Sequence, residues 1–126
     1  MKKLLIVVLL PLLAVQCKKE NIDRCIKGKV VRISCASYVI QVLNNSSIGE
    51  DGWRDSIQGQ QTTYDNVFTA SNKCDVPLSF KPGDIIYFTL EKPAPNDCVI
   101  CTMYDAPPQT QYQVRNVSSA PCEGVQ

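Results

Sequence analysis

Apolar and polar residues alternate along most of the chain, and this pattern predicts β-strands and not helices. The clearest run is residues 85–91, IIYFTLE, in which Ile86, Phe88 and Leu90 form one apolar face. The opposite face of this run is partly apolar as well, so we expect the strand to be central. No segment after the N-terminal leader has a convincing helical period.

Further strands are predicted at residues 29–34, 37–44, 64–71, 98–104 and 111–118. The first two of these form a plausible hairpin. In the last one, Tyr112, Val114 and Asn116 are expected to share a face, because side chains in a strand alternate between its two sides.

Turn signals separate these runs. Residues 81–84, KPGD, combine proline and glycine in the order that favours a turn. Residues 44–63 are polar with three glycines, which predicts a long loop with at most one short helical turn. Five or six short strands with such breaks indicate an all-β fold, a small antiparallel barrel or sandwich.

The N-terminal leader differs from everything that follows. Lys2 and Lys3 precede an apolar run, residues 4–13, that only Pro11 interrupts. A bilayer core needs about 20 apolar residues, whereas a secretory signal uses about 7–15. We therefore expect a cleaved signal peptide, and an uncleaved N-terminal membrane anchor is the alternative. The predicted organisation is a signal peptide at 1–16, a tether at 17–24 and a single β-domain at 25–126.

The end of the leader resembles the lipobox of bacterial lipoproteins, through Leu13, Ala14 and Cys17. The sequence departs from the common pattern with Ala14 in place of Leu and with a large residue, Gln16, before the cysteine. The resemblance implies that Cys17 becomes the first residue and carries lipid. No Asp follows Cys17 directly, and the Lys/Glu tract at 18–20 resembles export signals of surface lipoproteins in Bacteroidota-type bacteria. An outer-membrane lipoprotein, periplasmic or surface-facing, is the expectation.

The domain itself resembles small envelope lipoproteins that share a "C…G.V" start and a later "F+PGD.I.F" segment. The residues that carry this resemblance are Cys25, Gly28, Val30, Phe80, Pro82, Gly83, Asp84, Ile86 and Phe88. These are turn and core residues, so the resemblance implies a fold, an OB-like five-stranded barrel, and no particular activity.

Seven cysteines are an odd number, and assigning Cys17 to lipid leaves an even set. The six that remain are Cys25, Cys35, Cys74, Cys98, Cys101 and Cys122. An exported chain meets an oxidising compartment, so three disulfides are expected, with the connectivity left open. A bridge between Cys25 and Cys122, which flank the strands, is one candidate. A zinc site is not expected, because structural zinc sites usually use two close cysteine pairs and only one is present.

That close pair is Cys98 and Cys101, a CxxC spacing. A thiol–disulfide redox protein that uses this pair is the alternative function. However, Val99 and Ile100 between them favour an extended backbone, which places the two Cα atoms about 10 Å apart. A disulfide needs at most about 7 Å, so we expect each cysteine to bond elsewhere.

Composition excludes several function classes. The chain has 13 basic and 12 acidic residues, and removal of Lys2 and Lys3 with the leader leaves 11 against 12, a net charge of −1. Without a basic patch, nucleic acid is not an expected partner. The chain has no histidine, the commonest general base and metal ligand. No catalytic constellation, metal site or cofactor is predicted.

One polar segment stands out as a candidate binding surface. Residues 49–56 contain the only tryptophan together with charged side chains, and the candidate residues are Glu50, Asp51, Trp53, Arg54 and Asp55. An aromatic platform beside polar groups suits a sugar ring or a partner protein. Calcium binding through the carboxylates is an alternative, although the spacing is not that of an EF-hand. The competing interpretation is a solvated loop whose Trp53 folds back onto the barrel end.

Asp55-Ser56-Ile57 resembles the O-glycosylation acceptor of Bacteroidota-type exported proteins, which makes Ser56 a candidate modification site. Together these patterns predict a lipid-anchored cell-envelope protein. Its expected partners are the membrane, through the N-terminal lipid, and a protein or glycan of unknown identity.

Overall fold

The computed structural model describes residues 25–57 and 62–122. The expected signal peptide, the tether and Cys17 lie outside the described residues. Within the two described ranges, no helix is long and apolar enough to cross a membrane.

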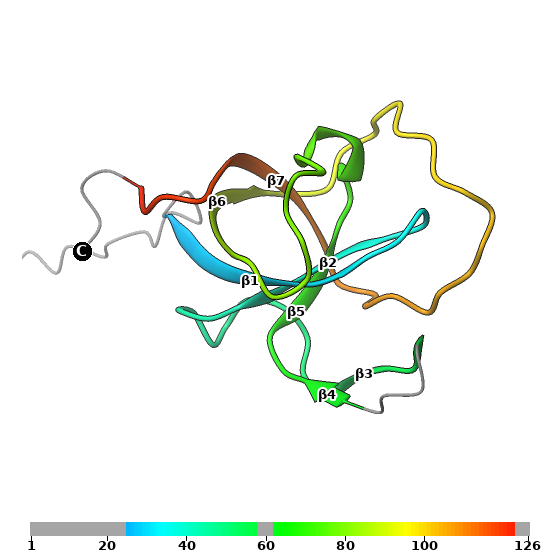
Figure 1. The fold of residues 1–126 in the computed structure, drawn as a ribbon, viewed down its shortest axis with the longest axis horizontal. Coiled ribbons are helices and arrows are strands. Elements are labelled where there is room, and N and C mark those ends of the chain that lie inside the picture. The colour runs from blue at the N-terminus through cyan, green and yellow to red at the C-terminus, as the bar shows by residue number, and fades with distance from the viewer. Residues whose placement is uncertain (1–24, 58–61, 123–126) are drawn as a thin grey trace, which may run out of the picture.

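Five strands close into a barrel (Figure 1). Their order around the barrel is β1 (Ile26–Ile33), β2 (Tyr38–Val42), β5 (Val67–Ala70), β7 (Gln111–Ser118) and β6 (Ile85–Glu91). All neighbours are antiparallel except β5 and β7, which run parallel. A separate two-stranded sheet contains β3 (Trp53–Asp55) and β4 (Thr62–Tyr64), and a 3-10 turn, η2, spans Lys73–Asp75. The predicted all-β, OB-like barrel is confirmed.

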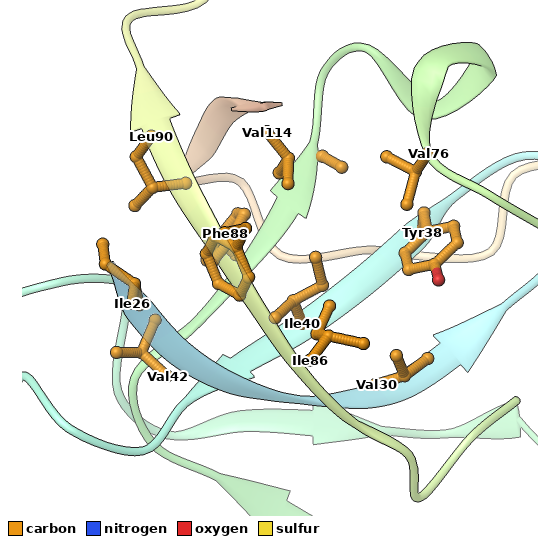
Figure 2. Close-up of a cluster of buried hydrophobic side chains, with 12 residues drawn as sticks. Ile26, Val30, Tyr38, Ile40, Val42, Val76, Ile86, Phe88, Leu90 and Val114 are labelled. Atoms are coloured by element: carbon orange, nitrogen blue, oxygen red, sulfur yellow. The ribbon is translucent and has the colours of Figure 1, made fainter. Parts of the chain in front are cut away.

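The barrel encloses one hydrophobic core (Figure 2). Its buried residues are Ile26, Val30, Tyr38, Ile40, Val42, Phe68, Ala70, Val76, Ile86, Phe88, Leu90 and Val114. The predicted apolar face of β6 points into this core, with Ile86, Phe88 and Leu90 at most 1% exposed. Gly28 on β1 leaves room for that packing, because a Cβ there would meet Phe88 Cε1 at 2.7 Å.

Three disulfides brace the barrel, which confirms that feature of the predicted fold. They join Cys25 to Cys122, Cys35 to Cys101, and Cys74 to Cys98. The first connects the residue before β1 with the segment after β7. The other two both hold the long connection between β6 and β7, one to the β1–β2 turn and one to η2.

A β-bulge in β1 decides where Arg32 lies. Val30 pairs with Ile40 but Arg32 pairs with Val39, so one residue of β1 is unmatched. Without the bulge, alternation would place Arg32 in the core beside Val30, where a buried charge is very costly. With the bulge, Arg32 joins Val39 on the outer side of the barrel wall, and Ile33 packs against the core instead.

Two predicted elements differ from the structure. Residues 98–104 are β-prone but form no strand, because each strand of the closed barrel already pairs with two neighbours and leaves no free edge for this segment. The predicted strand at 64–71 is divided, since Asn66 takes a left-handed backbone (φ 57°) that separates β4 from β5. The loop predicted at 44–63 contains β3 and the start of β4.

Asn116 is also misplaced by the predicted pattern. Its φ of 53° coincides with a register shift between β6 and β7, where Tyr87 pairs with Ser118 but Thr89 pairs with Arg115. The bulge breaks the alternation of β7, so Asn116 is exposed and Val114 alone is fully buried on the expected face.

Candidate functional site: a cleft beside Trp53

A second layer of chain covers part of the outer barrel wall. It consists of the β3–β4 sheet and the segment 104–110 that leads into β7. Glu50 connects this layer to the barrel, since its backbone bridges to Val67 of β5 and its carboxylate accepts a 2.7 Å hydrogen bond from the Gln109 amide. On the wall beneath, Thr69 donates from Oγ1 to the Pro108 carbonyl at 2.8 Å. These contacts explain why outward-facing residues of β5 are buried.

Arg32 lies between the barrel wall and this layer. Its guanidinium donates to Asp55 Oδ1 at 2.9 Å and to the backbone carbonyl of Asp105 at 2.8 Å. It also lies 3.5 Å from the Asp105 carboxylate. The Arg32 side chain is only 8% exposed and that of Asp105 only 1%. A single buried cation therefore holds β3 and the segment before β7 against the barrel.

Trp53 packs directly on this cation. The Arg32 guanidinium carbon lies 5.0 Å from the centroid of the Trp53 ring, a cation–π distance. The indole N–H donates to the Ala106 carbonyl at 3.0 Å, and Tyr64 of β4 lies against the ring at 6.0 Å. These contacts fix the orientation of the indole. The Trp53 side chain is half-buried, with the rest of it facing solvent.

A surface cleft of about 370 Å³ opens beside Trp53. Its lining residues are Glu50, Asp51, Gly52, Trp53, Arg54, Tyr104, Ala106, Pro107 and Gln109. Four of the five residues of the candidate binding surface thus meet at one cleft, together with an exposed tyrosine from the segment before β7. Its lining combines aromatic and apolar side chains with several polar groups, and the cleft is shallow and widely open to solvent.

The carboxylates of this region each have a separate partner. Glu50 accepts from the Gln109 amide, Asp51 from the Asn66 amide at 3.0 Å, and Asp55 from Arg32. They do not converge, and no group of three metal-ligating side chains occurs among the described residues. These carboxylates therefore hold the loops in place through hydrogen bonds, and they can also accept hydrogen bonds from a ligand.

Asp105 is the most deeply buried carboxyl of the site. Burial raises its pKa, but hydrogen bonds from the Ser34 and Ser37 hydroxyls and the charge of Arg32 lower it further than burial raises it. The net effect is a pKa below the ordinary value of an aspartate. Ser37 donates to Asp105 Oδ2 at 2.7 Å, and Ser34 donates to the same oxygen. The ionised form is therefore the one that this pocket stabilises.

We expect this arrangement to make folding stability depend on acid pH. A carboxyl whose pKa is lowered in the folded state contributes stability above its unfolded pKa, about 3.9. The contribution is lost as the pH falls through the lower folded value. Urea unfolding from pH 6 downwards should show a gap between wild type and Asp105→Asn that shrinks below about pH 4.

The exposed carboxyl of Asp97 provides the control, since Asp97→Asn should show no comparable gap. A gap between wild type and Asp105→Asn that stayed constant down to the lowest measurable pH would contradict the assigned role of the Asp105 carboxylate.

The structure also places the other predicted site residues, the candidate modification site and the CxxC cysteines. Ser56 is exposed just after β3, accessible to modification. Cys98 and Cys101 are bonded to Cys74 and Cys35, and not to each other.

Sequence patterns missed Arg32 and Asp105 as organisers of the site. The one available signal was the basic residue Arg32 in phase with apolar Val30 on a buried strand, which requires a bulge or a buried partner. Nothing local to Asp105 shows that it lies beside Arg32, 73 positions earlier.

The fold and the cleft define the class of this protein: a small, disulfide-braced, OB-like barrel with an aromatic surface cleft. No protein-family model matches the chain, and no curated protein matches its sequence.

Proposed function

We propose that this is a lipid-anchored protein of the bacterial cell envelope, held at the outer membrane by an acylated Cys17. Its barrel acts as a binding or accessory module. The observation that carries the proposal is the cysteine pairing. Six of the seven cysteines pair with one another in three disulfides, which leaves Cys17 outside this even set. Disulfides persist in oxidising compartments such as the bacterial periplasm and the cell surface.

The position of the barrel in the chain fits such an anchor. Cys25 precedes β1 directly, so residues 18–24 alone would separate a lipid on Cys17 from the domain. A fully extended chain of this length spans at most about 25–30 Å. The barrel would then stay close to the membrane surface, where an accessory module meets envelope proteins or glycans.

The cleft beside Trp53 is the proposed ligand site. Its aromatic wall is fixed by Arg32 and the Ala106 carbonyl, and its rim carries the exposed Tyr104. Rigid aromatic side chains supply contact area at a low entropic cost. Backbone groups and the Glu50 and Gln109 side chains surround that wall with polar atoms. This combination favours a neutral glycan, whose sugar rings have apolar faces and polar edges.

No observation favours the alternative of a thiol–disulfide enzyme. Such an enzyme cycles the two cysteines of a CxxC pair between thiols and a mutual disulfide. Cys98 and Cys101 instead belong to two different disulfides that fix the same loop.

The anchor is tested by replacing Cys17 with alanine in the full chain. We expect Cys17→Ala to remain unprocessed and to lose lipid labelling, because no thiol is left to acylate. Globomycin, which blocks lipoprotein signal cleavage, should cause the precursor of the wild type to accumulate. Processing is read from the mass of the protein, and lipidation from incorporation of a labelled fatty acid.

Gln16→Ala is the matched control, since it changes the neighbouring residue toward the common lipobox and should be processed at least as well as wild type. Unchanged lipid labelling in Cys17→Ala would refute the anchor.

The cleft is tested through the fluorescence of Trp53, the only tryptophan in the chain. Titration with neutral oligosaccharides, such as chitotetraose and maltotetraose, should produce a saturable change in emission for at least one sugar. Tyr104→Ala should weaken that binding by about tenfold, because it removes one aromatic wall. Tyr87→Ala on β6, outside the cleft, should leave the affinity unchanged. Equal affinity in both variants, or no response to any sugar, would contradict a glycan site here.

A further inference from the structure

The long connection between β6 and β7 contains a segment, residues 97–104, that we name the strap. It has no regular secondary structure, and Figure 1 shows this yellow-to-orange part of the chain standing off from the barrel. Two disulfides hold it, Cys98–Cys74 at η2 and Cys101–Cys35 at the β1–β2 turn. Cys98 and Cys101 are therefore fixed on two different elements, and Val99 and Ile100 lie between these two attachment points.

The strap exposes apolar side chains in an unusual concentration. Val99 is 91% exposed and Tyr104 86%, and Ile100 and Met103 are each 53% exposed. Single exposed apolar residues are ordinary on protein surfaces, but a contiguous group marks an interaction site. Tyrosine and methionine are also enriched at protein interfaces. Folding of this domain leaves this group in water, so burying it remains favourable.

The backbone of the strap is available as well. Its one hydrogen bond to other backbone within the described ranges runs from the Cys101 amide to the Cys35 carbonyl, at 3.4 Å. An extended segment with unpaired N–H and C=O groups can add to the open edge of another sheet, while its alternate side chains fill pockets. Because disulfides already restrict Cys98 and Cys101, ordering the strap on binding costs less entropy than ordering a free loop.

The charges around the strap distinguish a protein partner from a membrane surface. No Lys or Arg occurs from residue 93 to residue 110. Asp97 is exposed beside the Cys74–Cys98 disulfide, whereas Asp75 in the same hollow already pairs with Arg115 at 3.4 Å. Segments that insert at bilayer surfaces usually carry basic residues that meet anionic headgroups. An apolar strap with an acidic neighbour instead complements a protein groove that has a basic rim.

We propose that the strap is a docking element for a partner protein. It adds as an extended strand to an open sheet edge of the partner, with Val99 and Ile100 packed on opposite faces of that sheet and a basic side chain facing Asp97. The strap shares Tyr104 with the cleft, but neither Val99 nor Ile100 lines the cleft, so serine at these two positions tests the strap alone. The proposal holds whether or not the cleft binds a glycan.

The test begins with a photo-crosslinking amino acid at Val99 in the full chain, expressed in the cell that makes it. The matched control carries the same group at Leu43, a 45% exposed apolar residue just beyond β2, at the opposite end of that strand from the Cys35–Cys101 disulfide. We expect one protein to crosslink from position 99 and not from position 43. That protein is then purified and its affinity for the full chain is measured.

Val99→Ser combined with Ile100→Ser should weaken this affinity by at least about tenfold, and Leu43→Ser should leave it unchanged. Hydrogen exchange supplies a readout specific to strand addition, because the amides of residues 99 and 100 should become protected in the complex. Circular dichroism and a non-reduced mass map verify that the variants keep the barrel and its disulfides.

Several results would overturn the proposal. They are the absence of any crosslinked protein at position 99, equal crosslinking from position 43, and an affinity unchanged by the two serines. Crosslinking to a second copy of this chain would replace it with self-association. Co-sedimentation of the purified chain with phosphatidylethanolamine–phosphatidylglycerol vesicles, lost in the serine variant, would identify a bilayer as the occupant instead.

Discussion

Replacing Arg32 with methionine is expected to lower the free energy of unfolding by about 3–5 kcal/mol, the usual cost of removing one partner from a buried ion pair. Methionine keeps much of the apolar stem, so lost packing contributes little. The cost arises because Asp55 and the 1% exposed Asp105 side chain would lose their cation while remaining largely buried between the second layer and the barrel wall. Urea unfolding monitored by circular dichroism measures the change.

The surface offers a matched control with the same substitution. Arg115 also contacts two carboxylates, those of Asp75 and Glu91, both at 3.4 Å, but its side chain is 43% exposed. Exposed ion pairs contribute about 0–1 kcal/mol, so Arg115→Met should be nearly neutral. If the two variants lost the same stability, Arg32 would not be the organiser of the site. We also expect Trp53 emission to change in Arg32→Met alone, because the cation–π contact is lost.

Loss of the Cys25–Cys122 disulfide is expected to have the next largest effect. These cysteines are 97 positions apart, but Cys35–Cys101 remains in a Cys25→Ser, Cys122→Ser double variant and shortens the loop in the unfolded chain. The effective loop is about 30 residues, for which the chain-entropy relation gives about 3–4 kcal/mol.

Thermal and urea unfolding of this double variant, compared with wild type under non-reducing conditions, measures that cost. The amides of Ile26 to Gly28 should exchange faster with solvent, because the start of β1 would lose its covalent link to the chain after β7. A change below about 1 kcal/mol would show that the bridge does not constrain the unfolded chain as the loop-closure argument requires.

The barrel could be predicted because its strands follow local rules. The bounds of β6 and β7 agree with their apolar runs, and the KPGD turn at 81–84 precedes β6 as predicted. Closure and the parallel pairing of β5 with β7 depend on contacts between distant strands, which alternation does not encode. The strand predicted from β-propensity at residues 98–104 is also absent, because no free strand edge is available for this segment to pair with.

The candidate site could be predicted only in part. Trp53 and its charged neighbours stand out in the sequence as a group, and the structure places most of them at one cleft. Its other wall comes from Tyr104 and Pro107, about fifty positions later. Arg32 joins the two walls from a third segment, so no local pattern could have shown that they meet.

The most direct test of the account is a mass map of the native protein, extracted from membranes and digested without reduction. We predict disulfide-linked peptides for Cys25–Cys122, Cys35–Cys101 and Cys74–Cys98, and an N-terminal peptide that starts at Cys17 and carries fatty acids. Free thiols at Cys98 and Cys101, a disulfide between these two, or an unmodified Cys17 in a chain that still begins at Met1 would contradict it.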